Sequence, residues 1–229
     1  MKYCLYLLVM VIALTGCDKE SIDTSKSSYN QGIDLAIQGK LKKAESAFTS
    51  AINDEKDKQA AQQSLAVLKK ALSGKLNKEA TINFFEGVRY SNEGQRELAY
   101  SYFSKAIKAV PDFSSAYFER GIVNGRLKLY PQAVSDFTKA IDLNPQDAAA
   151  FNNRGLAYAR GLKQYEKAID DFTKAVVLDP DFAEAHDNRA IAYQIGNDDK
   201  KKACADWKKA CDLGRCNSLN RARQNGYCT

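Results

Sequence analysis

The sequence has few of the residues on which enzyme active sites depend. Among its 229 residues there is a single histidine, His186. A catalytic triad with a second histidine is therefore excluded, and most metalloenzyme sites are disfavoured. The chain also lacks a glycine-rich phosphate loop ending in Lys-Ser or Lys-Thr, a His-Glu-x-x-His helix and a Gly-x-Ser-x-Gly turn. We expect no catalytic residue, no metal site and no cofactor.

A strong excess of one charge is also missing. The chain carries 34 basic and 28 acidic residues, which gives a formal net charge of +6. Acidic residues are interspersed with basic ones along the chain, so no basic stripe is visible. Because proteins that bind nucleic acids usually show such a stripe, we expect no nucleic-acid partner and interpret the charges as a solvated helical surface.

Proline is scarce as well, but its positions are regular. Three of the four prolines, Pro111, Pro145 and Pro180, lie 34 and 35 residues apart. Each follows a stretch in which small and aromatic residues recur at helical spacing. Proline cannot continue a helix, and a fixed period of this length is typical of stacked helical hairpins. The sequence therefore predicts a repeat solenoid.

The clearest copy of the repeat is residues 114–147, with Gly121, Ala133, Phe137 and Ala140 at its characteristic positions. A degenerate copy without the closing proline comes first, and the last two copies carry one extra residue. We place that residue in the turn between the two helices. The other copies occupy residues 25–58, 80–113, 148–182 and 183–217.

These positions resemble the tetratricopeptide repeat family. The resemblance implies an all-α fold, a right-handed superhelix of stacked antiparallel helical hairpins with a C-terminal capping helix. Gly121, Gly155 and Ala190 would let each first helix lie close to its partner. Aromatic residues, and His186 at one of their positions, are then expected to pack between helices and not to form a ligand cage.

One charged pair recurs in three copies of the repeat. An arginine in the first helix is matched by an aspartate in the second, and we expect an ion pair that bridges neighbouring hairpins. Such a pair fixes packing geometry more than it adds stability. The residues are Arg120, Arg154 and Arg189, and Asp136, Asp171 and Asp206.

The N-terminus has the pattern of a processing signal. Lys2 precedes an apolar run over residues 3–14, which is too short to span a bilayer. The run ends in Leu14-Thr15-Gly16-Cys17, which resembles the bacterial lipoprotein box. The resemblance implies that residues 1–16 are a signal peptide, that Cys17 is lipidated and that the protein is anchored in the cell envelope. Residues 17–27 are polar and are expected to form a flexible tether.

Two segments fall outside the repeat pattern. Residues 59–79 contain an extra amphipathic helix at 59–73 and a linker. The extra helix could change the curvature of the solenoid, cover one edge or form a homodimer contact, and the sequence does not choose among these roles. Residues 218–229 are polar and are expected to cap the last hairpin, since stacked repeats need a polar end.

Four cysteines lie in the last 26 residues, and an even cluster in an exported protein indicates disulfides. Cys204 and Cys211 are seven residues apart on one helix, about 10 Å, which is too far for a bond. Cys211 and Cys216 flank a turn at Gly214. We predict the pairs Cys211–Cys216 and Cys204–Cys228. The alternative is a metal site, although no Cys-x-x-Cys pair is present.

In the family that the chain resembles, the first helices line a concave groove for a peptide or a helix of a partner. The Lys and Asn residues that clamp a terminal carboxylate are absent at the positions of Phe84 and Val88 and their equivalents, which disfavours a clamp for a chaperone tail. The predicted groove is apolar at one end and polar at the other, which suits an amphipathic segment laid lengthwise. The predicted groove residues are Phe84, Val88, Phe118, Ile122, Asn152, Leu156, Asp187 and Ile191, with Arg126 and Arg160 near the rim.

The expected function is that of a membrane-anchored adaptor, without enzymatic activity, that holds a protein or peptide partner in a bacterial cell-envelope complex. The alternative is a regulator that recruits or restrains an envelope enzyme such as a peptidoglycan hydrolase. The identity of the partner distinguishes the two.

Overall fold

The computed structural model describes residues 26–228, which form α-helices and two π-helical turns and no strand. The all-α fold class is thereby confirmed. The elements are α1 (Ser28–Ile37), α2 (Leu41–Ala51), α3 (Lys58–Leu72), α4 (Lys78–Asn92), α5 (Arg96–Ala109), α6 (Ser114–Arg126), α7 (Tyr130–Leu143), α8 (Ala148–Leu156), η1 (Ala157–Leu162), α9 (Tyr165–Leu178), α10 (Ala183–Ala192), η2 (Tyr193–Asn197), α11 (Lys200–Asp212) and α12 (Asn217–Gln224).

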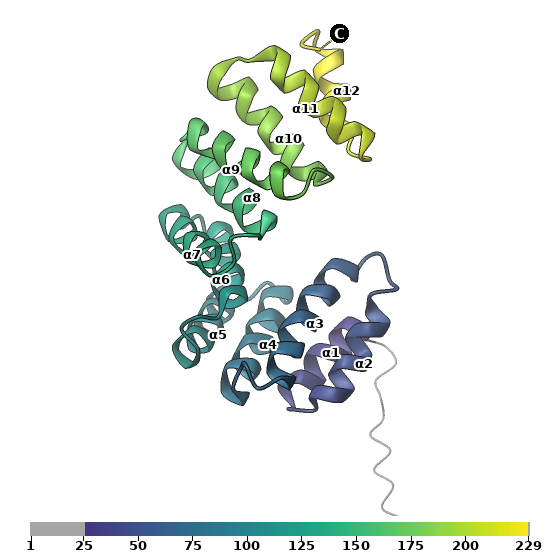
Figure 1. The fold of residues 1–229 in the computed structure, drawn as a ribbon, viewed down its shortest axis with the longest axis vertical. Coiled ribbons are helices and arrows are strands. Elements are labelled where there is room, and N and C mark those ends of the chain that lie inside the picture. The colour runs from purple at the N-terminus through teal and green to yellow at the C-terminus, as the bar shows by residue number, and fades with distance from the viewer. Residues whose placement is uncertain (1–25, 229) are drawn as a thin grey trace, which may run out of the picture.

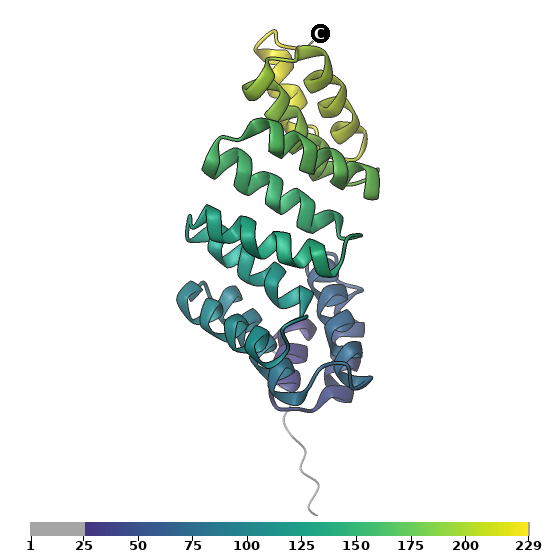
Figure 2. The ribbon, with the colours of Figure 1, turned by 60° about the vertical axis from the view of Figure 1, so that its left-hand side comes forward.

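The helices pair into antiparallel hairpins that stack along one axis. The pairs are α1 with α2, α4 with α5, α6 with α7, α8 with α9, and α10 with α11. The stack bends around an open side in Figure 1, with α5, α7 and α9 on its outer side and the first helices on its inner side. The first and last helices lie at opposite ends of the molecule in both ribbon views (Figures 1 and 2).

Local sequence signals set the helix ends. The side chains of Asn77, Asp147 and Asp199 each accept a hydrogen bond from a backbone N–H in the first turn of α4, α8 and α11. Such caps satisfy donors that have no partner within the helix. The residues before Pro111, Pro145 and Pro180 leave the helical conformation and end α5, α7 and α9, as expected for the residue that precedes a proline.

Glycine allows the close contact inside each hairpin. A Cβ atom at Gly32, Gly87, Gly121 or Gly155 would lie 2.6 to 2.8 Å from a phenylalanine ring of the partner helix. The close approach that the sequence predicts at Gly121 and Gly155 is therefore confirmed. The rings themselves belong to the core, and Phe48, Phe103, Phe137 and Phe172 expose at most 2% of their surface.

The extra helix α3 is used inside the chain. It packs mainly on α2, while α4 packs on α1. This packing buries its apolar face, since Ala61, Val67 and Leu68 expose 0%, 2% and 0% of their surface. Of its large apolar residues only Leu72, at 38%, is exposed. Most of the apolar face of α3 is therefore buried within the chain, and α3 covers an edge of the N-terminal hairpin. The homodimer contact considered for residues 59–73 stays a prediction.

The extra residue of the last two repeats was predicted to lie in the turn between the two helices, and this prediction is wrong. It is absorbed in π-helical turns that end the first helices, η1 and η2. A π turn holds one more residue than an α turn. The following residues, Lys163 and Asp198, have φ angles of 52° and 46° and begin the connection to α9 and α11. Lys128 occupies the same left-handed position in the repeat without an insertion.

The C-terminal end is closed by α12 and two disulfides. Cys204 is bonded to Cys228 and Cys211 to Cys216, with Cα–Cα distances of 5.7 and 4.0 Å. These are the predicted pairs. Leu219 and Ala222 of α12 pack in the same cluster as Trp207, so the helix covers the exposed face of the last hairpin.

Several sequence predictions fall outside the described residues. These are the signal peptide at residues 1–16, the lipidation of Cys17 and most of the tether at 17–27. Within residues 26–228, no helix combines the length and apolar character required to cross a bilayer.

Candidate functional site

Half of the predicted groove residues are buried in the core, which corrects the sequence interpretation. Their surfaces are exposed by 9% or less, so they cannot offer a binding surface to a partner. The physical reason is that neighbouring hairpins interlock through this row of side chains. The buried residues are Phe84, Val88, Phe118, Asn152 and Asp187.

The interlocking differs along the stack. The Phe84 ring lies 5.1 Å from the ring of Phe113 and 5.7 Å from that of Phe103. In the fourth repeat, the Asn152 side chain accepts a hydrogen bond from Asn188 at 2.9 Å. Asp187 lies 3.6 Å from Arg215 in an ion pair. Aromatic packing in the second repeat is therefore replaced by buried polar contacts in the fourth and fifth.

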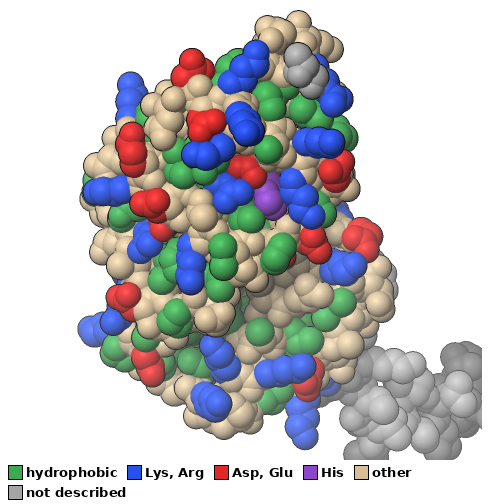
Figure 3. Space-filling model, turned by 45° about the horizontal axis from the view of Figure 1, so that its top comes forward, with side chains coloured by type: hydrophobic (Ala, Val, Ile, Leu, Met, Phe, Trp, Pro, Cys, Tyr) green, Lys and Arg blue, Asp and Glu red, His purple; other side chains and the backbone are tan. Residues whose placement is uncertain are grey.

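The other five predicted residues reach the surface. Ile122, Leu156 and Ile191 are half-buried, and Arg126 and Arg160 are exposed. These are the side chains one turn further along each first helix. Figure 3 shows the face turned toward the C-terminal end, where hydrophobic side chains surround a hollow and charges of both signs are mixed. Contact of these five residues with a partner remains a prediction.

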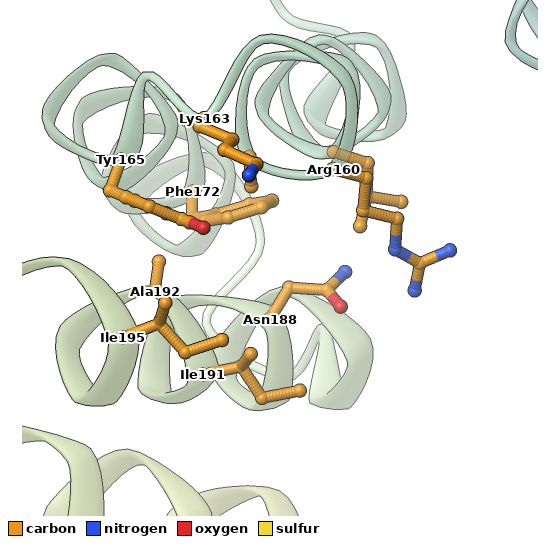
Figure 4. Close-up of a pocket in the computed structure, with 10 residues that line it drawn as sticks. Arg160, Lys163, Tyr165, Phe172, Asn188, Ile191, Ala192 and Ile195 are labelled. Carbon is orange, nitrogen blue, oxygen red and sulfur yellow. The ribbon is translucent and has the colours of Figure 1, made fainter. Parts of the chain in front are cut away.

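Three of these residues meet in one pocket between the fourth and fifth repeats. The pocket has a volume of about 280 Å³. Its apolar floor and walls come from α8, α9 and α10, and polar groups stand at its mouth (Figure 4). The lining residues are Leu156, Ala159, Arg160, Lys163, Tyr165, Phe172, Asn188, Ile191, Ala192 and Ile195.

The two π turns shape this pocket. Arg160 belongs to η1 and Ile195 to η2, while Lys163 directly follows η1. The second π turn lies tightly on the preceding hairpin, since a Cβ atom at Gly196 would be 2.5 Å from Tyr165. In turn, the Tyr165 ring forms one wall of the pocket. The sequence signal for this site was the extra residue in each of these repeats.

Two cations stand at the pocket without a carboxylate partner. No ion pair or hydrogen bond within the described residues involves Arg160 or Lys163, and no acidic residue lines the pocket. Figure 4 shows the Lys163 amine above Phe172 and beside Tyr165, and the Arg160 side chain at the opposite end of the mouth. By contrast, Arg126 donates a hydrogen bond to Ser91 at 3.0 Å.

The repeated Arg–Asp pair was predicted to bridge neighbouring hairpins. Instead, both residues of each pair lie within one hairpin. Arg154 donates two hydrogen bonds to Asp171, at 2.8 and 2.7 Å. A third hydrogen bond, from Arg154 to Thr138 at 3.1 Å, provides the link to the preceding hairpin. The hydrogen bonds that Arg154 donates to Asp171 raise the pKa of Arg154, and burial raises the pKa of Asp171. The same arrangement recurs at Arg120 and Arg189.

The sequence did not predict one buried carboxyl group. Glu119 of α6 has its carboxyl enclosed, although the residue as a whole is half-buried. Burial raises the pKa of Glu119 from 4.5 to about 7, and the charge of Arg126 offsets this only in part. Its charge also acts on Tyr29 of α1, so the carboxyl group faces the N-terminal hairpin.

His186 is a hydrogen-bonded packing residue. Its ring nitrogens lie 3.1 Å from an Asp206 carboxylate oxygen and 3.1 Å from the carbonyl oxygen of Pro180. Within residues 26–228 no group of His, Cys, Asp or Glu side chains is arranged to hold a metal ion. The four C-terminal cysteines are all engaged in the two disulfides.

Comparison with known families agrees with this geometry. The tetratricopeptide repeat pattern matches residues 114–147 and 137–170, and a TPR repeat pattern matches residues 162–196. Residues 114–196 therefore carry tetratricopeptide repeats. This matched region includes all the residues that line the pocket.

Curated relatives of this tetratricopeptide repeat protein are much longer than the chain. Tetratricopeptide repeat protein 6 of Homo sapiens is 27% identical over 143 residues, which are 57% of this chain and 28% of that protein. A UDP-N-acetylglucosamine–peptide N-acetylglucosaminyltransferase of Giardia intestinalis is 36% identical over 59 residues, which are 26% of this chain and 4% of that enzyme. The chain therefore spans less than a third of either relative.

Solved structures show the same solenoid. The MamA RS-1 ArsTM double mutant is 25% identical with a TM-score of 0.57, and the match covers 84% of this chain and 96% of that chain. The first TPR of Spaghetti (RPAP3), bound to an HSP90 peptide, is 26% identical with a TM-score of 0.50, covering 52% and 94%. YrrB, at 20% identity with a TM-score of 0.58, covers 89% and 94% and shares the fold.

These likenesses support a protein–protein interaction module with a protein or peptide as its partner. They point to a non-catalytic scaffold, in keeping with the scarcity of catalytic motifs in the sequence. At the pocket between the fourth and fifth repeats, apolar surface, cations and a concave shape coincide.

Proposed function

We propose that this tetratricopeptide repeat protein is a lipid-anchored adaptor that captures a segment of a partner protein in a complex of the bacterial cell envelope. The proposal rests on the pocket between the fourth and fifth repeats, because this pocket offers apolar surface that no element of the described chain covers. Ile195 at its edge exposes 58% of its surface. A partner segment would bury this surface and be stabilised by it.

The envelope location rests on the N-terminal sequence and on the cysteines. Lys2, the apolar run at residues 3–14 and Cys17 after Gly16 have the lipoprotein pattern. Two acyl chains bury enough methylene groups for stable anchoring, whereas one chain is marginal. Disulfides persist in oxidising compartments outside the cytosol, and the C-terminal cap depends on two of them.

Peptide capture is supported by a relative of similar sequence. The first TPR of Spaghetti (RPAP3) holds an HSP90 peptide, and it is 26% identical over about half of this chain. The half-buried residues Ile122, Leu156 and Ile191 belong to first helices, which form the inner side of the stack, and Leu156 and Ile191 line the pocket. A helix or an extended segment lying along this side would contact several repeats at once.

Photocross-linking in cells tests the proposal. A photoreactive amino acid at Ile195 should capture a defined envelope protein, which mass spectrometry then identifies. The matched control is Val177, which exposes 67% of its surface on the second helix α9, away from the pocket. Equal capture from both positions, or none from Ile195, contradicts the proposed binding surface. Palmitate labelling that persists after Cys17→Ser contradicts the anchor.

A further inference from the structure

The pocket between the fourth and fifth repeats combines an apolar interior with two unpaired cations. Its interior is formed by Leu156, Phe172, Ile191 and Ala192. A volume of about 280 Å³ is at the lower limit of the roughly 300–1,000 Å³ of small-molecule sites. Such a space suits one bulky side chain of a protein segment.

The cations stand at opposite ends of the pocket mouth. Figure 4 shows the Lys163 amine at the end near Tyr165 and the Arg160 side chain at the other end, beyond Asn188. The left-handed conformation of Lys163, with φ of 52°, fixes the point at which its side chain leaves the backbone. Because the lining contains no acidic residue, the mouth presents two positive charges to whatever occupies the pocket.

We propose that the pocket binds an internal acidic–apolar segment: one bulky aliphatic or aromatic side chain enters it, and carboxylates on both sides of that side chain pair with Lys163 and Arg160. This inference rests on the proposed function and specifies the chemistry of the partner. Charge complementarity selects the acidic flanks, since a cationic segment would be repelled from the mouth. The partner needs no free C-terminus, because both cations flank the apolar pocket.

The expected energetics divide between the two kinds of contact. The apolar side chain acts as the anchor, because buried anchors dominate the affinity of such interfaces. Each ion pair at the partly exposed mouth contributes little, and its loss should weaken binding about threefold to fivefold. Since these charges are near the surface, binding should also weaken as salt is added.

The test uses the purified protein with intact disulfides and short amidated peptides in a Gly-Ser background. Each peptide carries one leucine flanked by glutamate, serine or lysine, and binding is measured by fluorescence anisotropy. The glutamate-flanked peptide should bind best and the lysine-flanked peptide worst. Replacing its leucine with alanine should weaken binding about 30-fold.

Charge-neutral variants locate the effect. Arg160→Gln and Lys163→Gln should together reduce the affinity for the glutamate-flanked peptide about tenfold or more, and leave the serine-flanked peptide almost unaffected. Lys139→Gln with Lys174→Gln is the matched control, because both lysines are exposed on the second helices and neither lines the pocket. The control should bind like the unmodified protein.

Several outcomes overturn the inference. Equal binding of the three peptides removes the role of the carboxylates, and binding only by peptides with a free C-terminal carboxylate makes the site a terminal one. If photocross-linking from Ile195 captures a partner while no acidic–apolar peptide binds, the proposed function stands and this inference fails. If neither experiment detects binding at the pocket, both are refuted.

Discussion

Replacing Glu119 with glutamine should stabilise the protein at neutral and alkaline pH. The carboxyl group of Glu119 is buried, with Tyr29 of the N-terminal hairpin within reach of its charge, and burial raises its pKa to about 7. Below pH 4.5 the group is protonated in the folded and the unfolded chain, so it costs nothing. As the pH rises from 4.5 to 7, the unfolded chain releases the proton while the folded chain retains it, and stability falls.

The size of the effect follows from the two pKa values. One pH unit between them corresponds to about 1.4 kcal/mol. The interval from 4.5 to about 7 therefore limits the cost of burying the ionised group to about 3 kcal/mol. Glu119→Gln has no charge to bury. The variant should match the unmodified protein near pH 4 and exceed its free energy of unfolding by up to about 3 kcal/mol at pH 8.

Urea unfolding followed by circular dichroism between pH 4 and pH 8 measures this difference directly. Glu97→Gln is the matched control, because the Glu97 side chain is exposed on α5. A gain for Glu119→Gln that is the same at every pH would refute the reasoning, since a packing effect has no reason to titrate. No gain at pH 8 would show that the ionised carboxylate reaches water in the folded chain.

The remaining predictions concern packing and covalent links. Gly155→Ala should destabilise the fold by about 1–3 kcal/mol, because its Cβ would lie 2.7 Å from a core phenylalanine ring. Gly125→Ala, with nothing within 4 Å of the added Cβ, should instead stabilise its helix by up to about 1 kcal/mol; thermal unfolding measures both. Cys204→Ser with Cys228→Ser should cost about 3 kcal/mol through the lost 24-residue link, and reductant should then have less effect on the melting temperature. Phe84→Glu should unfold the second repeat, since Phe84 is 3% exposed, and a variant that stays folded by circular dichroism would contradict its assignment to the core.

The last of these predictions changes how the binding surface is tested. From the repeat pattern alone, Phe84 and Phe118 were expected to line the groove, and glutamate at both positions would have been an attractive way to abolish binding. Both side chains are buried, so such a variant loses its fold together with its function. Arg160, Lys163 and Ile195 reach the surface, and substitutions there separate binding from stability.

Residues close together in the sequence determine the helical hairpins and one of the disulfides of this protein. The spacing of Gly121, Phe137 and Pro145 specifies a helical hairpin, because each residue has a role that depends only on its own helix and its partner. The pairing of Cys211 with Cys216 followed in the same way from a turn at Gly214. Contacts between nearby residues leave few alternatives, so a sequence pattern is enough to predict them.

The tertiary structure decided which of the repeated side chains face a partner. Phe118 and Ile122 are one helical turn apart, and only the way neighbouring hairpins interlock buries the first and leaves the second half-exposed. The extra residue in two repeats was visible in the sequence, but its place in η1 and η2, and the pocket that these turns shape, depend on packing against Tyr130 and Tyr165. The burial of Glu119 likewise depends on the fold, which brings it near Tyr29 of α1, far from it in the sequence. The period of the sequence repeat determines each helical hairpin, whereas the packing of one hairpin on the next determines which side chains are open to a partner.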